Sequence, residues 1–272
     1  MIETDFKDCL WEPIGGNKDN MRYIGNQKTN ASGTLTELII NSIDSLLILG
    51  CIKSGKNPTE LDAPKDMNDA SELYYKIPNG DIYNCFPKEK TGLSGGWIRL
   101  SKNVKTQNNI PITKLAENIN LIFLNSNHGK KRNTIIVYDK GTGQAPQDFK
   151  NTFLYHKTDN KLKIPFVQGK YGMGGTGVIP RCGLKKYVFI LSCRHPDICK
   201  PSEKNKWGWT IIRKHEASKD EKMSYYEYLC TNTEDKEIFS FFSESIPNAL
   251  SGNEYDYNKQ TILTHEMRLG TY

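Results

Sequence analysis

The segment ELIINSID, residues 37–44, lies in a predicted helix that spans residues 34–50, with Gly50 as its end. The apolar residues of this helix recur at helical spacing and form one stripe: Leu35, Leu38, Ile39, Leu46 and Leu47. Glu37, Asn41 and Asp44 share a polar face, because they are separated by four and three positions. Such a carboxylate and amide, one turn apart, can hold a hard cation beside a water molecule. Alternatively, Thr34 and Glu37 form a capping box, and the other two are a solvated face.

The segment DKGTG, residues 139–143, directly follows a predicted buried strand over 133–138. An acidic residue at a strand end, followed by two glycines, can direct a carboxylate into a pocket beside a tight turn. That carboxylate can accept a hydrogen bond from an exocyclic amine such as that of adenine. The alternative is an ordinary turn in which Asp139 caps a following helix.

The segment GKYGMGGTG, residues 169–177, has five glycines in nine residues. Backbone N–H groups in such a loop can bind phosphate oxygens, especially where the loop leads into a helix. The spacing is not that of a P-loop. No strand of a dinucleotide fold is predicted before the loop, because residues 160–168 include several polar residues and a proline. A tight surface loop without a ligand is the alternative.

The remaining segments predict a single α+β domain over residues 1–272. Helical character is predicted for 111–124, and a polar loop for 53–69. Residues 74–100 indicate an insertion or peripheral hairpin with a short strand at 96–100, within a stretch, 50–125, that has no recognisable family pattern. Three late strands predict an antiparallel meander, and they cover residues 186–193, 207–214 and 225–231.

Composition narrows the class of protein. A charged content of 25% and a hydrophobic content of 37% are typical of globular domains, and the net charge of +6 permits contact with nucleic acid without requiring it. Seven cysteines, an odd number, argue against a full disulfide framework. The first 13 residues lack the pattern of a secretory signal. No uninterrupted apolar run approaches the ~20 residues needed to span a bilayer, so we expect a cytoplasmic protein without membrane contact.

The three segments, in this order and context, resemble the Bergerat-fold nucleotide site of the GHKL family. That family includes the ninety-kilodalton heat-shock chaperone, MutL, DNA gyrase B, MORC proteins and histidine kinases. The terminal RLGTY, residues 268–272, resembles the GT element of the last strand of the family's pocket. The resemblance covers residues 25–45 and 130–272. It implies a two-layer sandwich, with a mixed, mostly antiparallel sheet and helices on one face.

The resemblance also implies roles for individual residues. Glu37 would polarise the attacking water, Asn41 would ligate Mg²⁺, and Asp44 would support the pocket floor. Asp139 would bind the adenine amine beside Gly141 and Gly143, and Thr271 would assist through water. The phosphates would be wrapped by the glycine loop, in which Lys170 is a candidate contact and the other residues are Gly172, Met173, Gly174, Gly175, Thr176 and Gly177.

Residues 144–168 would then be the lid over ATP, with Lys157 and Thr158 as candidate contacts to the γ-phosphate. Gln144 departs from the methionine that family members usually have there. Hydrolysing members also take a lysine or arginine from a following transducer domain, and the sequence ends at Tyr272. We therefore expect the chain by itself to bind ATP and to hydrolyse it slowly.

The predicted function is that of a Mg²⁺-dependent ATPase domain, in which ATP closes the lid and drives homodimerisation or movement of a downstream domain. The alternative is a non-catalytic module that dimerises when it binds ATP. A histidine-kinase catalytic domain is disfavoured by Glu37. Zinc is disfavoured because the spacing of Cys182, Cys193, His195 and Cys199 fits no common structural site. The cluster Lys200, Lys204 and Lys206 is interpreted as a solvated loop rather than a nucleic-acid contact.

Overall fold

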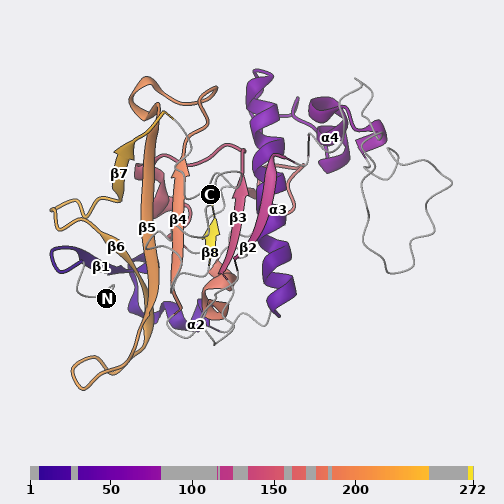
Figure 1. The fold of residues 1–272 in the computed structure, drawn as a ribbon. Helices are drawn as coiled ribbons and strands as arrows, with labels where there is room; N and C mark the ends of the chain where they lie inside the picture. The colour runs from indigo at the N-terminus through magenta and orange to yellow at the C-terminus, as the bar shows by residue number, and fades with distance from the viewer. Residues whose placement is uncertain are drawn as a thin grey trace.

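A mixed sheet of eight strands organises the computed structural model (Figure 1). The structure describes residues 6–25, 30–80, 115, 117–124, 134–155, 161–169, 176–182, 186–244 and 269–271. The strands are β1 (Leu10–Pro13), β2 (Ile119–Leu124), β3 (Thr134–Asp139), β4 (Val188–Cys193), β5 (Lys206–His215), β6 (Tyr225–Cys230), β7 (Phe239–Phe242) and β8 (Leu269–Thr271). The α-helices are α2 (Met21–Ile24), α3 (Ala31–Lys53) and α4 (Met67–Tyr75). Short 3₁₀ helices are η1 (Ile14–Gly16), η2 (Lys18–Asn20), η3 (Pro78–Gly80), η6 (Pro146–Asn151), η8 (Thr176–Arg181) and η9 (Pro201–Glu203).

The strand order is β1-β6-β5-β4-β8-β3-β2, with β7 paired to β5 outside this path. Strand β8 is parallel to both of its neighbours, β3 and β4, and the other described pairs are antiparallel. The predicted meander is confirmed, because β4, β5 and β6 pair in succession as antiparallel strands. The α+β class is likewise confirmed, and the strand predicted over 133–138 is β3.

Helix α3 is longer than predicted at both ends and lies along β2 and β3 (Figure 1). Its N-cap is Asn30, whose side-chain oxygen accepts the N–H of Gly33 at 2.7 Å. Thr34 lies inside the helix, where its hydroxyl donates to the carbonyl of Asn30 at 3.0 Å. The capping-box interpretation of Thr34 and Glu37 is therefore wrong. Gly50 does not end the helix either, because α3 continues to Lys53. Glycine at this position accommodates Tyr74, since a Cβ there would lie 2.8 Å from the Cβ of Tyr74.

The helical prediction over 111–124 is wrong for its last six residues, which form β2. Apolar and aromatic side chains dominate this segment, and its backbone pairs with the whole of β3, from Ile119 opposite Asp139 to Leu124 opposite Thr134. Sheet pairing therefore outweighs the weak helical pattern. The short strand predicted at 96–100 lies outside the described residues.

Helix α4 was not predicted: it begins within the last three residues of the predicted loop over 53–69, and it packs against α3 (Figure 1). Asp66 caps it by accepting the N–H of Asp69 at 2.9 Å. The helix has only nine residues and few apolar ones, so its periodicity in the sequence is faint. Ala70 is buried against α3 with Met67, Tyr74 and Tyr75 around it, whereas Leu73 is exposed.

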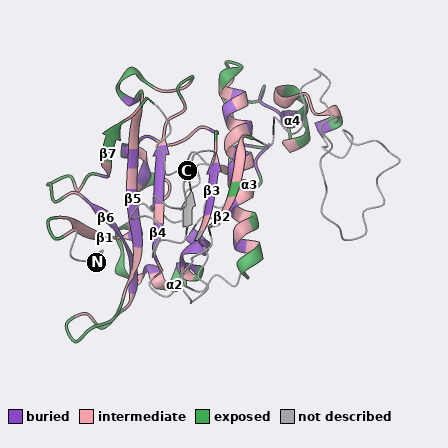
Figure 2. Ribbon diagram, in the orientation of Figure 1, coloured by how far each residue is buried: buried purple, intermediate pink, exposed green. Residues whose placement is uncertain are grey.

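The main core lies between the sheet and the α3 layer, and Figure 2 shows the central strands as largely buried. Val137 of β3, Ile190 of β4 and Ile212 of β5 point into it, and Leu38 of α3 packs against them. A second cluster, the α3–α4 cluster, packs α3 against α4 and against the segment before the glycine loop. Its buried residues are Leu47, Cys51, Ala63, Ala70, Ile164, Phe166 and Val167. The second cluster fixes the segment that enters the glycine loop.

Among the described residues, α3 is the one helix that is long and apolar enough to cross a membrane by length and composition. Helices in the cores of globular domains pass the same test. In this structure, α3 packs on the sheet and carries the fully buried carboxylate of Asp44.

Candidate functional site

The polar face of α3 carries Asp44, whose carboxylate is completely buried. Its Oδ1 accepts the backbone N–H of Gln168 and its Oδ2 accepts that of Gly169, each at 2.9 Å. A buried carboxylate requires such donors, because burial of an unpaired charge is strongly unfavourable. Asp44 therefore fastens the start of the glycine loop to the helix.

One cation lies between two oxygen atoms of the same helix face. The ammonium of Lys161 is 3.2 Å from Asn41 Oδ1 and 3.3 Å from Asp44 Oδ2. Gly169 approaches both oxygens so closely that a Cβ there would lie 2.8 Å from Asn41 Oδ1 and 3.0 Å from Asp44 Oδ2. A side chain at position 169 would therefore disturb this arrangement, which explains why glycine begins the loop.

The turn after β3 is bonded to the same helix through Ser45. The Ser45 hydroxyl accepts the N–H of Thr142 at 2.9 Å and lies 3.1 Å from the Thr142 hydroxyl. A Cβ at Gly141 would be only 2.1 Å from Ser45 Oγ. The first glycine of the DKGTG segment is therefore required by the close approach of the turn to α3, rather than by turn conformation alone.

Asp139, the last residue of β3, lies beneath this turn. Its Oδ1 accepts the N–H of Gly141 at 2.9 Å. Burial raises the pKa of the Asp139 carboxyl to about 6, although the hydrogen bond from Gly141, the hydroxyls of Ser42 and Ser45, and the charge of Lys161 act in the opposite direction. A carboxylate with a strongly perturbed pKa, enclosed by a helix and a turn, is typical of a binding site.

The second glycine of the turn, Gly143, has a φ of +56°. A Cβ there would lie 1.8 Å from the carbonyl oxygen of Cys193, at the end of β4. The backbone of the turn also accepts a hydrogen bond, since the N–H of His195 donates to Thr142 O at 2.9 Å. The turn is thus enclosed between α3 on one side and the end of β4 on the other.

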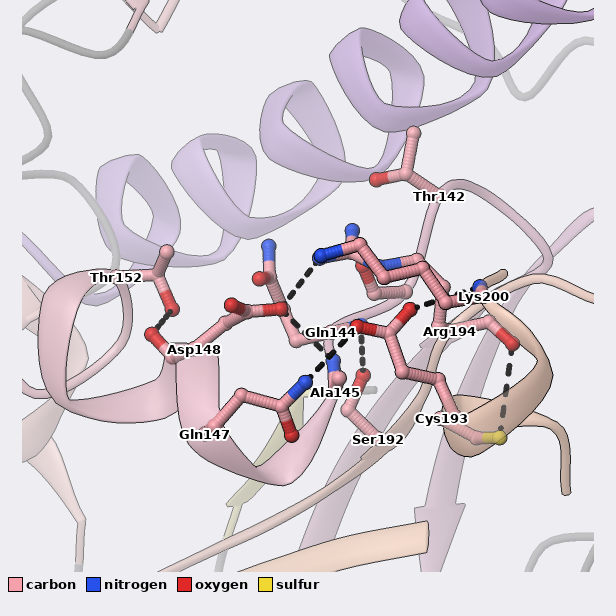
Figure 3. Close-up of polar contacts among 12 residues, drawn as sticks. Thr142, Gln144, Ala145, Gln147, Asp148, Thr152, Ser192, Cys193, Arg194 and Lys200 are labelled. Carbon is pink, nitrogen blue, oxygen red and sulfur yellow. Dashed lines mark hydrogen bonds and ion pairs between the residues drawn. The ribbon is translucent and has the colours of Figure 1, made fainter. Parts of the chain in front are cut away.

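Arg194, which was not predicted as a site residue, contacts the turn from the β4 side (Figure 3). Its guanidinium donates to the carbonyl of Gly143 at 2.8 Å and pairs with the carboxylate of Asp148 in η6. Ser192 Oγ accepts the N–H of Gln144 at 2.8 Å in the same network. Glu203 extends the network, because it accepts hydrogen bonds from the side chain of Gln147 and the N–H of Lys200.

Among the predicted residues that the structure describes, those of α3 and those of the 139–143 turn lie on neighbouring segments that are hydrogen-bonded through Ser45. Glu37, Asn41 and Asp44 line one face of α3. Gly141, beside Asp139, lies against Ser45 of the same helix, whereas Gly143 lies against the end of β4. Glu37 is partly buried and has no hydrogen-bond or ion-pair partner among the described residues. Thr176 and Gly177 are buried in η8, which contacts α3.

Thr271 lies in β8, in register with Val137 of β3 and Ile190 of β4. The GT element therefore lies between the strand that ends in Asp139 and the strand that ends in Cys193. The other predicted loop and lid residues lie outside the described residues: Lys157, Thr158, Lys170, Gly172, Met173, Gly174 and Gly175.

The structure describes two parts of the expected lid, residues 144–155 and 161–168, and both contain buried residues. Phe149 and Leu154 belong to the main core, and Ile164, Phe166 and Val167 belong to the α3–α4 cluster. The lid assignment of residues 144–168 stays a prediction.

Sequence reasoning missed Ser45, Lys161 and Arg194. Ser45 directly follows the ELIINSID segment and could have been found by extending the polar face of the helix by one residue. Lys161 and Arg194 have no sequence signal, because their partners lie 117 and 51 residues away. Only the folded chain brings these charges to the site.

Two oxygen atoms of the site are arranged as ligands of a hard divalent cation would be. Asn41 Oδ1 and Asp44 Oδ2 converge on a single ammonium, which stands in for a cation held by two oxygen ligands. The described residues contain no group of three or more His, Cys, Asp or Glu side chains suited to a metal. Within those residues, the four zinc candidates around Cys193 thus form no such group.

The chain matches no protein-family model, no curated protein and no solved structure.

Proposed function

We propose that the chain binds Mg-ATP between α3, the 139–143 turn and the loop that begins at Gly169, and hydrolyses it to ADP and phosphate. The observation that carries the proposal is that one helix face holds both other segments. Ser45 bonds the turn at Thr142, and Asp44, one residue earlier, bonds Gly169. Three segments that resemble a nucleotide site in the sequence therefore lie against one another.

We assign recognition of the adenine base to Asp139. Its carboxylate lies at the strand end and is oriented by the N–H of Gly141, so it can accept a hydrogen bond from the exocyclic amine of adenine. Guanine presents a carbonyl oxygen at the equivalent position, which would face the carboxylate unfavourably. The site should therefore prefer ATP to GTP.

The phosphates are assigned to the glycine loop and the metal to Asn41 Oδ1, with Asp44 beside it. Bound Mg²⁺ would neutralise charge on the phosphate oxygens. Glu37 lies one helical turn before Asn41, on the same face. Its carboxylate, without a described partner, would orient a water molecule toward the γ-phosphate and accept its proton at a carboxylate oxygen as the water attacks.

Glu37 is also the residue that separates the two functional alternatives. A general base at position 37 would serve ATP hydrolysis, whereas a module that only binds ATP and dimerises does not need one. Because Asn30 caps α3, Glu37 has no capping role to explain its presence. This favours hydrolysis, followed by dimerisation or movement of an attached domain, over binding alone.

Calorimetric titration with a non-hydrolysable ATP analogue and Mg²⁺ tests the pocket. Asp139→Asn should lose most of the binding, whereas Asp62→Asn, an exposed carboxylate on the α3–α4 loop, should bind like the unmodified chain. Equal affinity in all three proteins would overturn the pocket assignment. Phosphate release, measured in the same proteins and in Glu37→Ala, distinguishes the ATPase from a module that binds ATP and dimerises without hydrolysis.

A further inference from the structure

We propose that the ammonium of Lys161 is an internal counter-ion that occupies the cation position between Asn41 and Asp44, and that a divalent cation binds there only by displacing it. The inference rests on the proposed function for the identity of that cation. It adds a residue that the three sequence segments do not contain, and it makes cation binding a competition within the chain.

The geometry of the three side chains carries the inference. Asn41 Oδ1 and Asp44 Oδ2 lie at nearly equal distances, 3.2 and 3.3 Å, from Lys161 Nζ. An oxygen that accepts an N–H from the ammonium directs its lone pair toward that cation, as it would toward a metal. The same two oxygens therefore cannot ligate a divalent cation while Lys161 stays in place.

The ammonium is held loosely enough to be exchanged. Charge-assisted N–H···O contacts are typically about 2.7–2.9 Å long, so both contacts of Lys161 are longer than a tight pair. The Lys161 side chain is 27% exposed, whereas Asp44 is completely buried. The carboxylate is thus fixed by the N–H groups of Gln168 and Gly169, and its cationic partner can leave toward solvent.

Burial of Asp44 explains why a counter-ion is needed at all. Two backbone N–H groups satisfy hydrogen bonds but supply no net charge, and a buried carboxylate without a cation is unfavourable. The positive charge of Lys161 also reaches Asp139, where it lowers a pKa that burial raises. Lys161 therefore compensates the negative charge of the site in the absence of a metal, and a divalent cation would take over that role.

The experiment is a titration of Mn²⁺, followed by electron paramagnetic resonance, in the absence of nucleotide. It compares the unmodified chain with Lys161→Met, with Lys161→Met/Asn41→Leu and with Lys163→Met. Lys163 lies two residues away in the same loop and is exposed, so it controls for a general loss of positive charge. Far-UV circular dichroism and thermal unfolding check that each variant is folded.

Lys161→Met should bind Mn²⁺ about tenfold more tightly than the unmodified chain, within the usual range of coupling between competing ligands. Adding Asn41→Leu should remove that gain, and Lys163→Met should show none. The inference is overturned if folded Lys161→Met binds Mn²⁺ no better than the unmodified chain, or if the gain persists without Asn41. A Lys161→Met chain that folds only with Mn²⁺ supports it. If Lys161→Met does not fold under either condition, Lys161→Gln, which keeps a hydrogen-bond donor, replaces it with the same expected gain.

Failure of this inference is distinguishable from failure of the proposed function. The Mn²⁺ titration uses no nucleotide, whereas the nucleotide pocket is tested by calorimetry on Asp139→Asn. A gain in Mn²⁺ affinity without ATP binding would keep the cation exchange and reject the ATP site. ATP binding without that gain would keep the pocket and reject the exchange.

Discussion

The carboxylate of Asp44 accepts the backbone N–H of Gly169 at 2.9 Å, across 125 residues of sequence. This bond connects the middle of α3 with the first residue of the glycine loop. Because the carboxylate is completely buried, the bond is also part of what stabilises the domain. Structural and proposed functional roles therefore coincide in one side chain.

Asp44→Asn should destabilise the protein by about 2–4 kcal/mol in urea unfolding. The amide keeps one acceptor oxygen, but its NH₂ group would face either the N–H of Gln168 or the N–H of Gly169 together with the Lys161 ammonium. The matched control is Asp62→Asn, because Asp62 is 60% exposed and its ion pair with Lys56 is long, at 3.7 Å. The control should change the free energy of unfolding by no more than about 0.5 kcal/mol. If the two substitutions lowered the free energy of unfolding equally, the burial of Asp44 would not account for its contribution to stability.

Gly143→Ala should destabilise the protein more than Gly55→Ala, although both glycines have positive φ values, +56° and +80°. A Cβ at Gly55 meets no atom within 4 Å, so its cost of about 1 kcal/mol comes from backbone strain alone. At Gly143 the Cβ would also lie 1.8 Å from the carbonyl oxygen of Cys193, and the loss should reach about 3 kcal/mol. Thermal unfolding of the two variants measures the difference. A loss at Gly143 no greater than at Gly55 would mean that the turn can move away from β4.

Asp139→Asn should stabilise the protein above pH 7, even though we expect it to abolish nucleotide binding. The pKa of Asp139 is raised from 3.8 to about 6, so its contribution to stability is complete below pH 3.8 and is lost as pH rises through 6. The ionised, buried carboxylate then costs up to about 3 kcal/mol, which the neutral amide avoids. The advantage of the variant in thermal unfolding should shrink between pH 7 and pH 4.

Asp197→Asn provides a control of opposite sign for that pH series. Lys53 lowers the pKa of the Asp197 carboxyl through a hydrogen bond, so its contribution is present above the ordinary pKa and is lost as pH falls. Asp197→Asn should therefore not stabilise the protein at pH 7. An advantage of Asp139→Asn that does not depend on pH would contradict the assigned cause.

Glu37→Ala should stop phosphate release while changing the free energy of unfolding by no more than about 0.5 kcal/mol, because alanine favours helix and Glu37 has no partner among the described residues. Asn30→Ala is the matched helix variant. It removes the cap bond to Gly33 and should cost about 1 kcal/mol. The urea-unfolding midpoints and phosphate release of both proteins give the comparison. If Glu37→Ala were as unstable as Asn30→Ala and kept its turnover, Glu37 would be a structural residue only.

The sequence by itself was sufficient for features that depend on neighbouring residues. The strand that ends at Asp139 and the meander of β4, β5 and β6 follow from local apolar patterns, and so does the central part of α3. The polar face of α3 also follows from spacing alone, since Glu37, Asn41 and Asp44 are fixed on one side by helical geometry. These features need no knowledge of distant partners.

Only the tertiary structure decided the features that depend on partners far along the chain. Residues 119–124 are a strand because β3 supplies their hydrogen bonds, and the glycine at position 50 lies inside α3 where Tyr74 approaches the helix closely. Lys161 reaches Asn41 and Asp44 because Ile164, Phe166 and Val167 are anchored in the α3–α4 cluster. The physical reason is the same in each case: long-range packing and ion pairing contribute more free energy than the local preferences that a sequence pattern reports.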